Sequence, residues 1–167
     1  LTPSISTTAT HSTLFSDMWM NNSGGTVGDL IFDLGGTYSL SDIAIWQYDR
    51  DGVQDRGVKD FTLESSSDGI SFTSLLGTTT LSIAQYLPIT NEPAQIFALG
   101  NITASHVRLN YLNNYGEPLL TGLSEVQFVA TALPELPEPS TIAMFGIGAG
   151  IMGLVSIRRR RREQKQA

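Results

Sequence analysis

Two short segments of this 167-residue chain combine the side chains that sugar-binding sites use. Each holds an aromatic ring, which can pack on the C–H face of a sugar, beside polar groups that can hydrogen-bond sugar hydroxyls. Each follows a predicted strand, and strand ends place loops at one end of a β-sandwich. The candidate ligand-binding residues are Tyr48, Asp49, Arg50, Asn113, Asn114 and Tyr115. The same residue types also build ordinary turns, which is the alternative interpretation.

Residues that would indicate an enzyme are sparse. The sequence has no cysteine, no G-x-S-x-G nucleophile elbow and two histidines, neither close in sequence to a plausible nucleophile. We expect His106 to be structural, at the head of a strand, and His11 to be solvated within a Ser/Thr-rich segment. A glycosidase needs two placed carboxylates, and nothing in the sequence singles out a pair. We therefore expect a binding function and no catalytic residues.

The charge is divided unevenly along the chain. Residues 1–139 hold fifteen acidic and four basic side chains, a formal charge of −11, whereas residues 140–167 carry +5, for a total of −6. This split predicts two parts in different surroundings. The acidic part excludes a basic nucleic-acid binder and disfavours direct binding to anionic polymers. With no cysteine, an exported domain would have no disulfide.

Short apolar segments separated by turn signals predict an all-β domain over residues 1–132. Alternating or continuous apolar residues occur at 30–34, 43–46, 61–63, 72–76, 96–97, 107–111 and 126–128. Gly35-Gly36 and Asp68-Gly69 are typical of turns. Seven or eight such strands favour an antiparallel sandwich. The 43–46 segment is apolar on both faces, as in a central strand, and Trp19 and Trp46 are expected to lie in the core.

The carboxyl-terminal segment has the features of a membrane anchor. Residues 141–157 are free of charge and would span roughly 25 Å as a helix, near the short end of the range for a bilayer. Residues 133–139 form a proline-rich linker before it. Five basic residues follow it directly: Arg158, Arg159, Arg160, Arg161 and Arg162. An arginine excess marks the cytoplasmic side, so we predict a transmembrane helix within 140–167, with residues 1–132 outside the cytoplasm.

The order of motifs at this end resembles a PEP-CTERM sorting signal over residues 136–162. The motif itself is Pro137, Glu138 and Pro139, and a glycine-rich apolar run and the arginine cluster follow it. The resemblance implies an exported protein of a Gram-negative bacterium that makes exopolysaccharide. It also implies an exosortase as the processing enzyme, acting near the Pro-Glu-Pro motif. The sequence before residue 14 lacks an export signal, so we expect that signal to have been removed or to be missing.

A series of segments in the amino-terminal part resembles the discoidin domains, also called coagulation factor type C domains. The segments are 29–35 (DLIFDLG), 43–46 (IAIW), 56–64 (RGVKDFTLE), 67–73, 104–109 (ASHVRL) and 123–126 (LSEV). The resemblance implies a jelly-roll sandwich of about eight strands and a binding role, often for carbohydrates or lipids at cell surfaces. The chain departs from the family at 6–21, where the opening strand and first loop look compressed.

The same resemblance implies a calcium ion between the first loop and the last strand. The matching positions are Asp17 and Glu125. Calcium prefers carboxylate and carbonyl oxygens, and a metal clamp would benefit an acidic domain without disulfides. The alternative is a surface acid and a strand-edge acid with no metal.

Together these observations lead to one functional expectation and one alternative. We expect an exported, non-enzymatic cell-surface or matrix protein that is anchored in the inner membrane with its domain in the periplasm. After exosortase processing it would bind a glycan, with exopolysaccharide as the expected partner. The alternative is a permanently membrane-anchored structural or protein-adhesion domain without carbohydrate binding.

Overall fold

Two long strands form the frame of the molecule. The computed structural model describes residues 1–2, 4–5, 11–12, 14–22, 24–85 and 92–133. Strand β2 (Gly28–Gln47) runs antiparallel to β5 (Gln95–Tyr111) along almost their whole lengths. The pairing is irregular between Asp33 and Tyr38, and such irregularities bend a strand and increase its twist. Gly35 and Gly100 adopt positive φ angles of 72° and 75° in this part of the ladder, a conformation that glycine adopts without strain.

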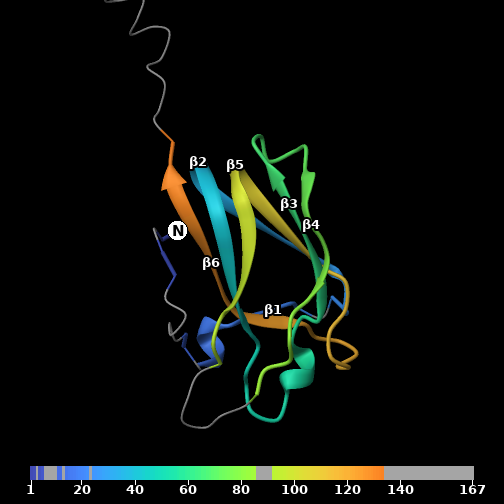
Figure 1. Cartoon of the computed structure of the whole chain (residues 1–167). Helices are drawn as coiled ribbons and strands as arrows, with labels where there is room; N and C mark the ends of the chain where they lie inside the picture. The colour runs from blue at the N-terminus through green and yellow to red at the C-terminus, as the bar shows by residue number, and fades with distance from the viewer. Residues whose placement is uncertain (3, 6–10, 13, 23, 86–91, 134–167) are drawn as a thin grey trace, which may run out of the picture. The chain divides into compact units, whose positions relative to one another are not determined.

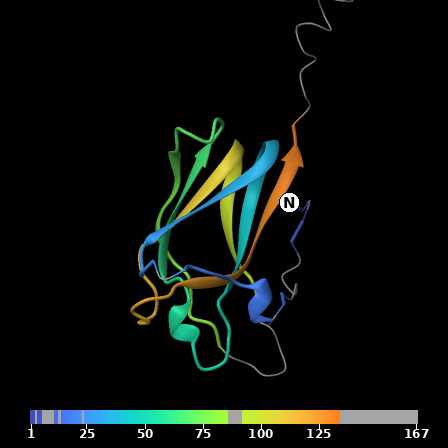
Figure 2. The ribbon, with the colours of Figure 1, turned by 180° about the vertical axis from the view of Figure 1, so that it is seen from behind.

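Because both strands bend, each contributes to two layers. The first half of β2 and the second half of β5 form one layer with β3 (Asp60–Ser66) and β4 (Thr73–Thr80). The second half of β2 forms the other layer with β6 (Gly122–Ala132), which also pairs with the short strand β1 (Trp19–Met20). Views from the front and the back show the two layers joined where β2 and β5 turn (Figure 1, Figure 2). The strand order is β1-β6-β2-β5-β3-β4, and all pairs are antiparallel.

The core lies between the layers and follows the alternation of the strands. On the first half of β2, Leu30 and Phe32 face inward while Asp29, Ile31 and Asp33 are exposed, as the period of two requires. Fully buried core side chains include Leu40, Ile43, Ile45, Phe61, Leu63, Val107 and Leu109. Phe32 meets Phe128 edge to face across the layers with ring centroids 5.4 Å apart, which adds specific aromatic contact to the buried area.

The predicted fold class is confirmed, but the strands are fewer and longer than expected. Segments 30–34 and 43–46 belong to the single strand β2, and segments 96–97 and 107–111 belong to β5. Gly35-Gly36 is a bend inside β2 and not a turn between strands. A turn and a bend within a strand both favour glycine, so the sequence alone does not distinguish them here. The structure does, because β2 is paired with β5 on both sides of the two glycines.

The edge of β6 opposite β2 is partly covered by the start of the chain. Thr2 forms a parallel bridge with Val129, through hydrogen bonds from Thr2 N to Phe128 O and from Ala130 N to Thr2 O. His11 is buried, with its ring centroid 6.4 Å from that of Trp46. The prediction that His11 is solvated is therefore wrong, whereas Trp46 is buried as expected.

The predicted membrane helix, the Pro-Glu-Pro motif and the arginine cluster all lie outside the described residues. Residues Leu1–Leu133 form one compact unit. Within the described part of the chain the helical elements are short 3-10 turns, η1 (Phe15–Asp17) and η2 (Gln54–Arg56). No helix found there has the length and hydropathy needed to cross a bilayer.

Candidate functional site

The loop that follows β2 turns its aromatic residue inward. Tyr48 is fully buried, and a Cβ atom added at Gly122 would lie only 2.8 Å from its Cδ2 atom. Because the ring packs on the glycine at the start of β6, it offers no face to a ligand. The prediction that Tyr48 contacts a sugar is therefore wrong. Arg50 is exposed, and its guanidinium carbon lies 4.6 Å from the centroid of the Phe15 ring.

Asp49 also points inward, toward His11, whose Ser/Thr-rich surroundings predict a solvated side chain. His11 Nε2 lies 3.3 Å from Asp49 Oδ2, and the two side chains are only 1% and 8% exposed. Ser124 on β6 donates a hydrogen bond of 3.4 Å to the other carboxylate oxygen. This cluster fastens the start of the chain to the loop after β2 and to β6. No local sequence signal could reveal it, because the pair is separated by 37 intervening residues.

The second predicted ligand segment is used to build its own loop. The Asn114 side chain is buried and donates to the carbonyl oxygens of Glu117 and Leu120 at 2.7 and 2.9 Å, while its Oδ1 accepts from Gly116 N at 2.9 Å. These bonds close the loop before β6. They favour the alternative interpretation, in which this asparagine stabilises a turn.

The neighbours of Asn114 are similarly engaged. Asn113 forms two hydrogen bonds with Asp60, from its Nδ2 to a carboxylate oxygen at 2.8 Å and from Asp60 N to its Oδ1 at 2.9 Å. The Tyr115 hydroxyl donates to Leu81 O, and partial burial raises the pKa of this phenol. We refer to residues 48–59 and 112–121 as the end loops. Among the six ligand-binding residues predicted there, Arg50 is the one left exposed.

An open pocket lies on one side of the sandwich, where the two layers do not share a strand. It has a volume of about 200 Å³, and we call it the side pocket. Its lining comes from η1, β1, the first half of β2 and the start of β6: Asp17, Trp19, Leu30, Phe32, Leu123, Ser124, Glu125 and Val126. The first half of β2 is the free edge of its layer, which leaves the pocket open.

The side pocket brings together the two acidic residues predicted as calcium ligands. Asp17 accepts a hydrogen bond of 3.0 Å from Ser16 Oγ, and Glu125 accepts one of 2.6 Å from Gln127 Nε2. Hydrogen bonds from the Ser12 and Ser16 hydroxyls lower the pKa of the Asp17 carboxyl, so it is ionised at neutral pH. The pocket therefore combines apolar walls, among them the Trp19 ring, with two carboxylates.

The donors fit calcium in type but not in number. Carboxylate and hydroxyl oxygens are hard ligands of the kind calcium prefers, and it usually takes six to eight of them. Among the described residues, however, no three His, Cys, Asp or Glu side chains come together as a metal cluster. A calcium ion held by Asp17 and Glu125 would have to complete its shell with backbone carbonyls or water.

Comparison with known sequences identifies the carboxyl-terminal signal. Residues 135–162 match the family model of the PEP-CTERM protein-sorting motif. The sequence-based identification of this signal is thereby confirmed, and the matched range begins one residue before the predicted one. A search of curated proteins finds no match to the chain.

Comparison with solved structures identifies the fold. CBM32-3 from a family 31 glycoside hydrolase of Clostridium perfringens aligns with a TM-score of 0.55 at 18% identity, covering 68% of this chain and 75% of the module. CpGH89CBM32-5 from the same organism, solved with GalNAc-β-1,3-galactose, aligns with a TM-score of 0.54 at 17% identity, covering 66% and 73%. These likenesses confirm the discoidin-like jelly-roll fold.

A whole enzyme also aligns, but only over a small part. The family 89 glycoside hydrolase of Clostridium perfringens matches with a TM-score of 0.50 at 20% identity. The match covers 72% of this chain but only 12% of the enzyme. The similarity therefore concerns one module-sized piece of that protein.

Proposed function

We propose that this protein is an exported, non-enzymatic module that binds a glycan outside the cytoplasm. The observation that carries the proposal is the combination, on one chain, of a sandwich with the fold of carbohydrate-binding modules and a PEP-CTERM protein-sorting motif. The fold supports binding because similar solved structures are such modules. The motif supports delivery to the surface, where polysaccharide is available.

The side pocket is the proposed binding site. A sugar ring has apolar C–H faces and a rim of hydroxyls, so it needs an apolar wall beside hydrogen-bond acceptors. Trp19, Leu30 and Phe32 supply the first, and the carboxylates of Asp17 and Glu125 supply the second. The end loops support this role less well, because Asn113 bonds to Asp60 and Asn114 bonds to backbone carbonyl oxygens.

We further propose that calcium strengthens this site. An ion between Asp17 and Glu125 would join η1 to β6 and neutralise part of the local negative charge. It would stabilise the folded state by mass action, as any ligand that prefers the folded protein does. Adding calcium should raise the melting temperature of the wild-type protein, and a chelator should reverse the rise. A Glu125→Gln variant should lose this response, and an equal response in the variant would contradict the assignment.

The route to the surface is also part of the proposal. An exosortase would process the chain near Pro137–Pro139, and the arginine cluster would keep the membrane segment oriented until then. The processed protein would join the exopolysaccharide matrix. Mass spectrometry of the mature protein tests this route. Loss of Arg158–Arg162 is expected, whereas an intact cluster would favour a permanently anchored structural or adhesion domain.

Binding is tested with the full chain held in mild detergent. Pull-down with extracted polysaccharides and a glycan array, each with calcium or with chelator, should reveal at least one bound glycan. A Trp19→Ala variant should weaken that binding about tenfold, because it removes the aromatic wall of the pocket. Arg50→Ala, in the end loops, is the control that should bind normally. Failure of the wild-type protein to bind any glycan under either condition would overturn the proposed function.

A further inference from the structure

A second pocket lies on the outer face of the β6-containing layer, away from the side pocket. Its volume is about 300 Å³, at the lower end of the range for small-molecule sites. The lining residues come from four segments of the chain: Ser4, Ile5, Asp42, Ile96 and Val129. We call it the sheet pocket. It shares no lining residue with the side pocket.

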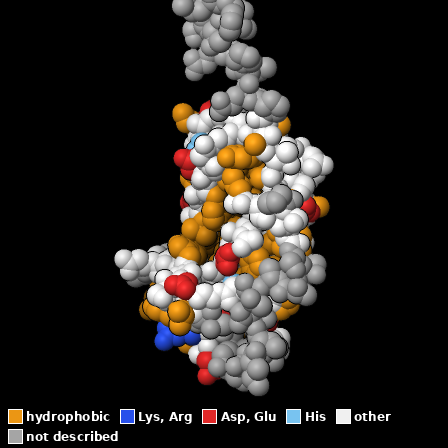
Figure 3. Space-filling view, turned by 90° about the vertical axis from the view of Figure 1, so that its left-hand side faces the viewer, with side chains coloured by type: hydrophobic (Ala, Val, Ile, Leu, Met, Phe, Trp, Pro, Cys, Tyr) orange, Lys and Arg blue, Asp and Glu red, His pale blue; other side chains and the backbone are white. Residues whose placement is uncertain are grey.

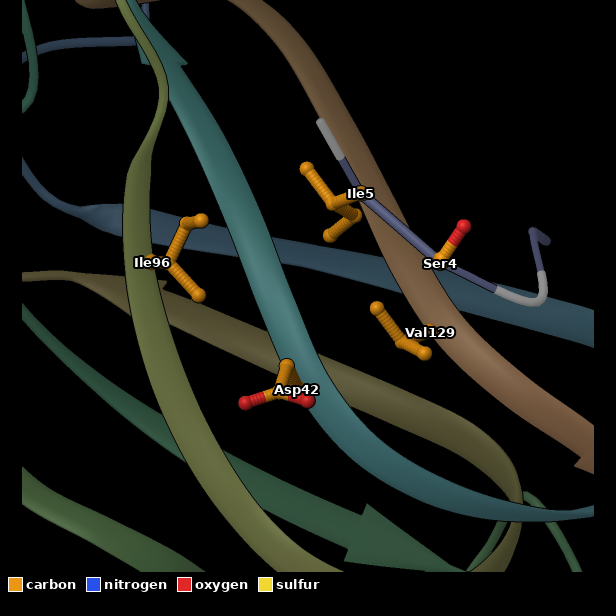
Figure 4. A pocket seen from close by; sticks show the side chains of 5 residues that line it. All are labelled: Ser4, Ile5, Asp42, Ile96 and Val129. Carbon is orange, nitrogen blue, oxygen red and sulfur yellow. The ribbon is translucent and has the colours of Figure 1, made fainter. Parts of the chain in front are cut away.

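The walls of the sheet pocket are fixed by the sheet beneath them. Asp42 on β2 is paired with Val129 on β6 and with Ala98 on β5, so the floor belongs to three hydrogen-bonded strands. Ile5 is held over this floor because the nearby Thr2 pairs with Val129. Figure 4 shows Asp42 between Ile96 on one side and Val129 on the other, with Ile5 and Ser4 above β6. Sites built on strands hold their groups in defined positions.

The sheet pocket places one carboxylate among three aliphatic side chains. Ser41 Oγ donates a hydrogen bond of 2.6 Å to Asp42 Oδ2. The ion pairs in the described part of the chain involve other acids, namely Asp49, Asp33 and Glu64, and none involves Asp42. A carboxylate beside apolar walls is poorly solvated, so it gains more from a cation than a fully hydrated acid does.

The side of the molecule that carries β6 also combines apolar and acidic side chains, over a larger area than the sheet pocket. In the space-filling view, hydrophobic side chains line an elongated hollow on this side, with acidic groups nearby (Figure 3). Residues 1–139 carry a formal charge of −11. A ligand for this surface must therefore tolerate negative charge, which disfavours uronic-acid polymers and favours a ligand with a positive group.

We propose that the sheet pocket binds an amino-sugar unit with a free ammonium group, as part of a glycan. The ammonium would pair with the Asp42 carboxylate, the C–H faces of the ring would pack on Ile96 and Val129, and the Ser4 hydroxyl could bond a ring hydroxyl. A neutral sugar would leave the half-buried carboxylate without a counter-charge. This inference rests on the proposed glycan-binding function and names the ligand class of a second pocket.

Two pockets on different parts of one module would also let one molecule bridge two glycan segments. The second contact is then made at the effective concentration set by the first, which raises the avidity for a polymer without any new contact. An oligomer too short to reach both pockets would not show this gain. A polymer with both neutral and amino-sugar units would be held most tightly.

The experiment compares oligosaccharides that differ only in the ammonium group. The full chain in mild detergent is titrated by calorimetry with glucosamine oligomers and with N-acetylglucosamine oligomers of the same length. We expect the free amines to bind about tenfold more tightly, with an advantage that shrinks at high salt. Asp42→Asn keeps the shape of the side chain but removes its charge, so it should abolish the preference. Asp51→Asn makes the same chemical change at an exposed position outside both pockets and should retain the preference.

Other outcomes separate the possible failures. Equal binding of both oligomers by the wild type, or an unchanged preference in Asp42→Asn, would overturn the amino-sugar site while leaving glycan binding intact. If neither oligomer nor any other glycan binds, the proposed function itself fails. Oligolysine competing as well as the glucosamine oligomer would show that any cation suffices, and would also overturn the proposal. Ile96→Ser tests the apolar wall; because Ile96 is 40% exposed, this change should weaken binding severalfold without unfolding the protein.

Discussion

The end loops and the side pocket contain similar residue types but use them in opposite ways. In the end loops, Asn113 bonds to Asp60 at the start of β3 and Asn114 bonds to backbone carbonyl oxygens, so these two side chains keep little hydrogen-bonding capacity for a ligand. In the side pocket, Asp17 and Glu125 each accept one hydrogen bond from a neighbouring side chain, but a carboxylate has further acceptor positions, and these line open space beside apolar walls. The difference shows that composition alone does not make a binding site. A polar side chain can recognise a ligand only when its neighbours have not already satisfied it.

The largest effect should come from removing the centre of the end loops. Asn114→Ala would leave the partly buried carbonyls of Glu117 and Leu120 and the N–H of Gly116 without their partner. We expect a loss of about 3 kcal/mol in the free energy of unfolding, measured by chemical denaturation. Arg50→Ala, an exposed change in the same region, should cost less than about 0.5 kcal/mol. Similar values for the two variants would contradict the structural role of Asn114.

The next effect concerns the buried pair of His11 and Asp49, which joins the start of the chain to the end loops. His11→Ala would leave Asp49 buried without its ring partner, at a cost of about 2 kcal/mol. The cost should be smaller than that of Asn114→Ala because the start of the chain can detach locally and let water reach Asp49. Trp46 would then be less shielded, so the tryptophan emission should shift to longer wavelength. Unchanged emission with unchanged stability would show that the pair does not fasten this segment.

The next effect depends on acid and concerns Asp68, in the turn between β3 and β4. Its carboxylate, like the polar groups of the end loops, bonds to its own turn. Hydrogen bonds from the backbone N–H groups of Ser71 and Ile70, with help from the Ser66 hydroxyl, lower the pKa of Asp68 from 3.8 to about 2. A lowered pKa in the folded state contributes stability above pH 3.8, and this contribution is lost as the pH falls toward 2. Denaturation midpoints measured from pH 5 to pH 2 should therefore fall less in Asp68→Asn than in the wild type. Asp51→Asn, an exposed change, should follow the wild-type curve, and identical curves for all three would refute the assignment.

The smallest effect should come from Tyr48, and its direction is the informative part. The buried Tyr48 hydroxyl has no hydrogen-bond partner among the described residues. Tyr48→Phe should therefore leave the free energy of unfolding unchanged or raise it by up to about 1 kcal/mol. Thermal denaturation measures this difference. Glycan binding should be unchanged. A loss of binding in this variant would restore the ligand role that its burial argues against.

The sequence predicts the fold class because alternation along a strand is a local property. Leu30 and Phe32 face the core and Asp29 faces outward, as their spacing requires. Continuity of a strand is not local: β2 continues through Gly35-Gly36 only because β5 stays paired with it on both sides. The sorting motif was identifiable because composition and order alone define it.

The candidate site was harder to predict than the fold. Asp17 and Glu125 were found through a family resemblance, and the structure places both on the side pocket. Tyr48 was misassigned because strand ends usually lead to exposed loops, whereas here the close approach of Gly122 makes room for a buried ring. The pair of His11 and Asp49, and the sheet pocket around Asp42, depend on contacts between distant segments. No single-sequence pattern encodes such contacts.

The position of β6 has a mechanical consequence. A force that pulls on the carboxyl-terminal end of the domain acts first on β6. This strand is paired with β2 along its length, from Ala132 opposite Tyr38 to Leu123 opposite Gln47. The bridge from Thr2 to Val129 adds a further connection on the outer side of β6. β2 in turn continues into the second layer, so the load passes along a covalent strand into both halves of the sandwich. The domain is thus built to bear tension at this end as one unit.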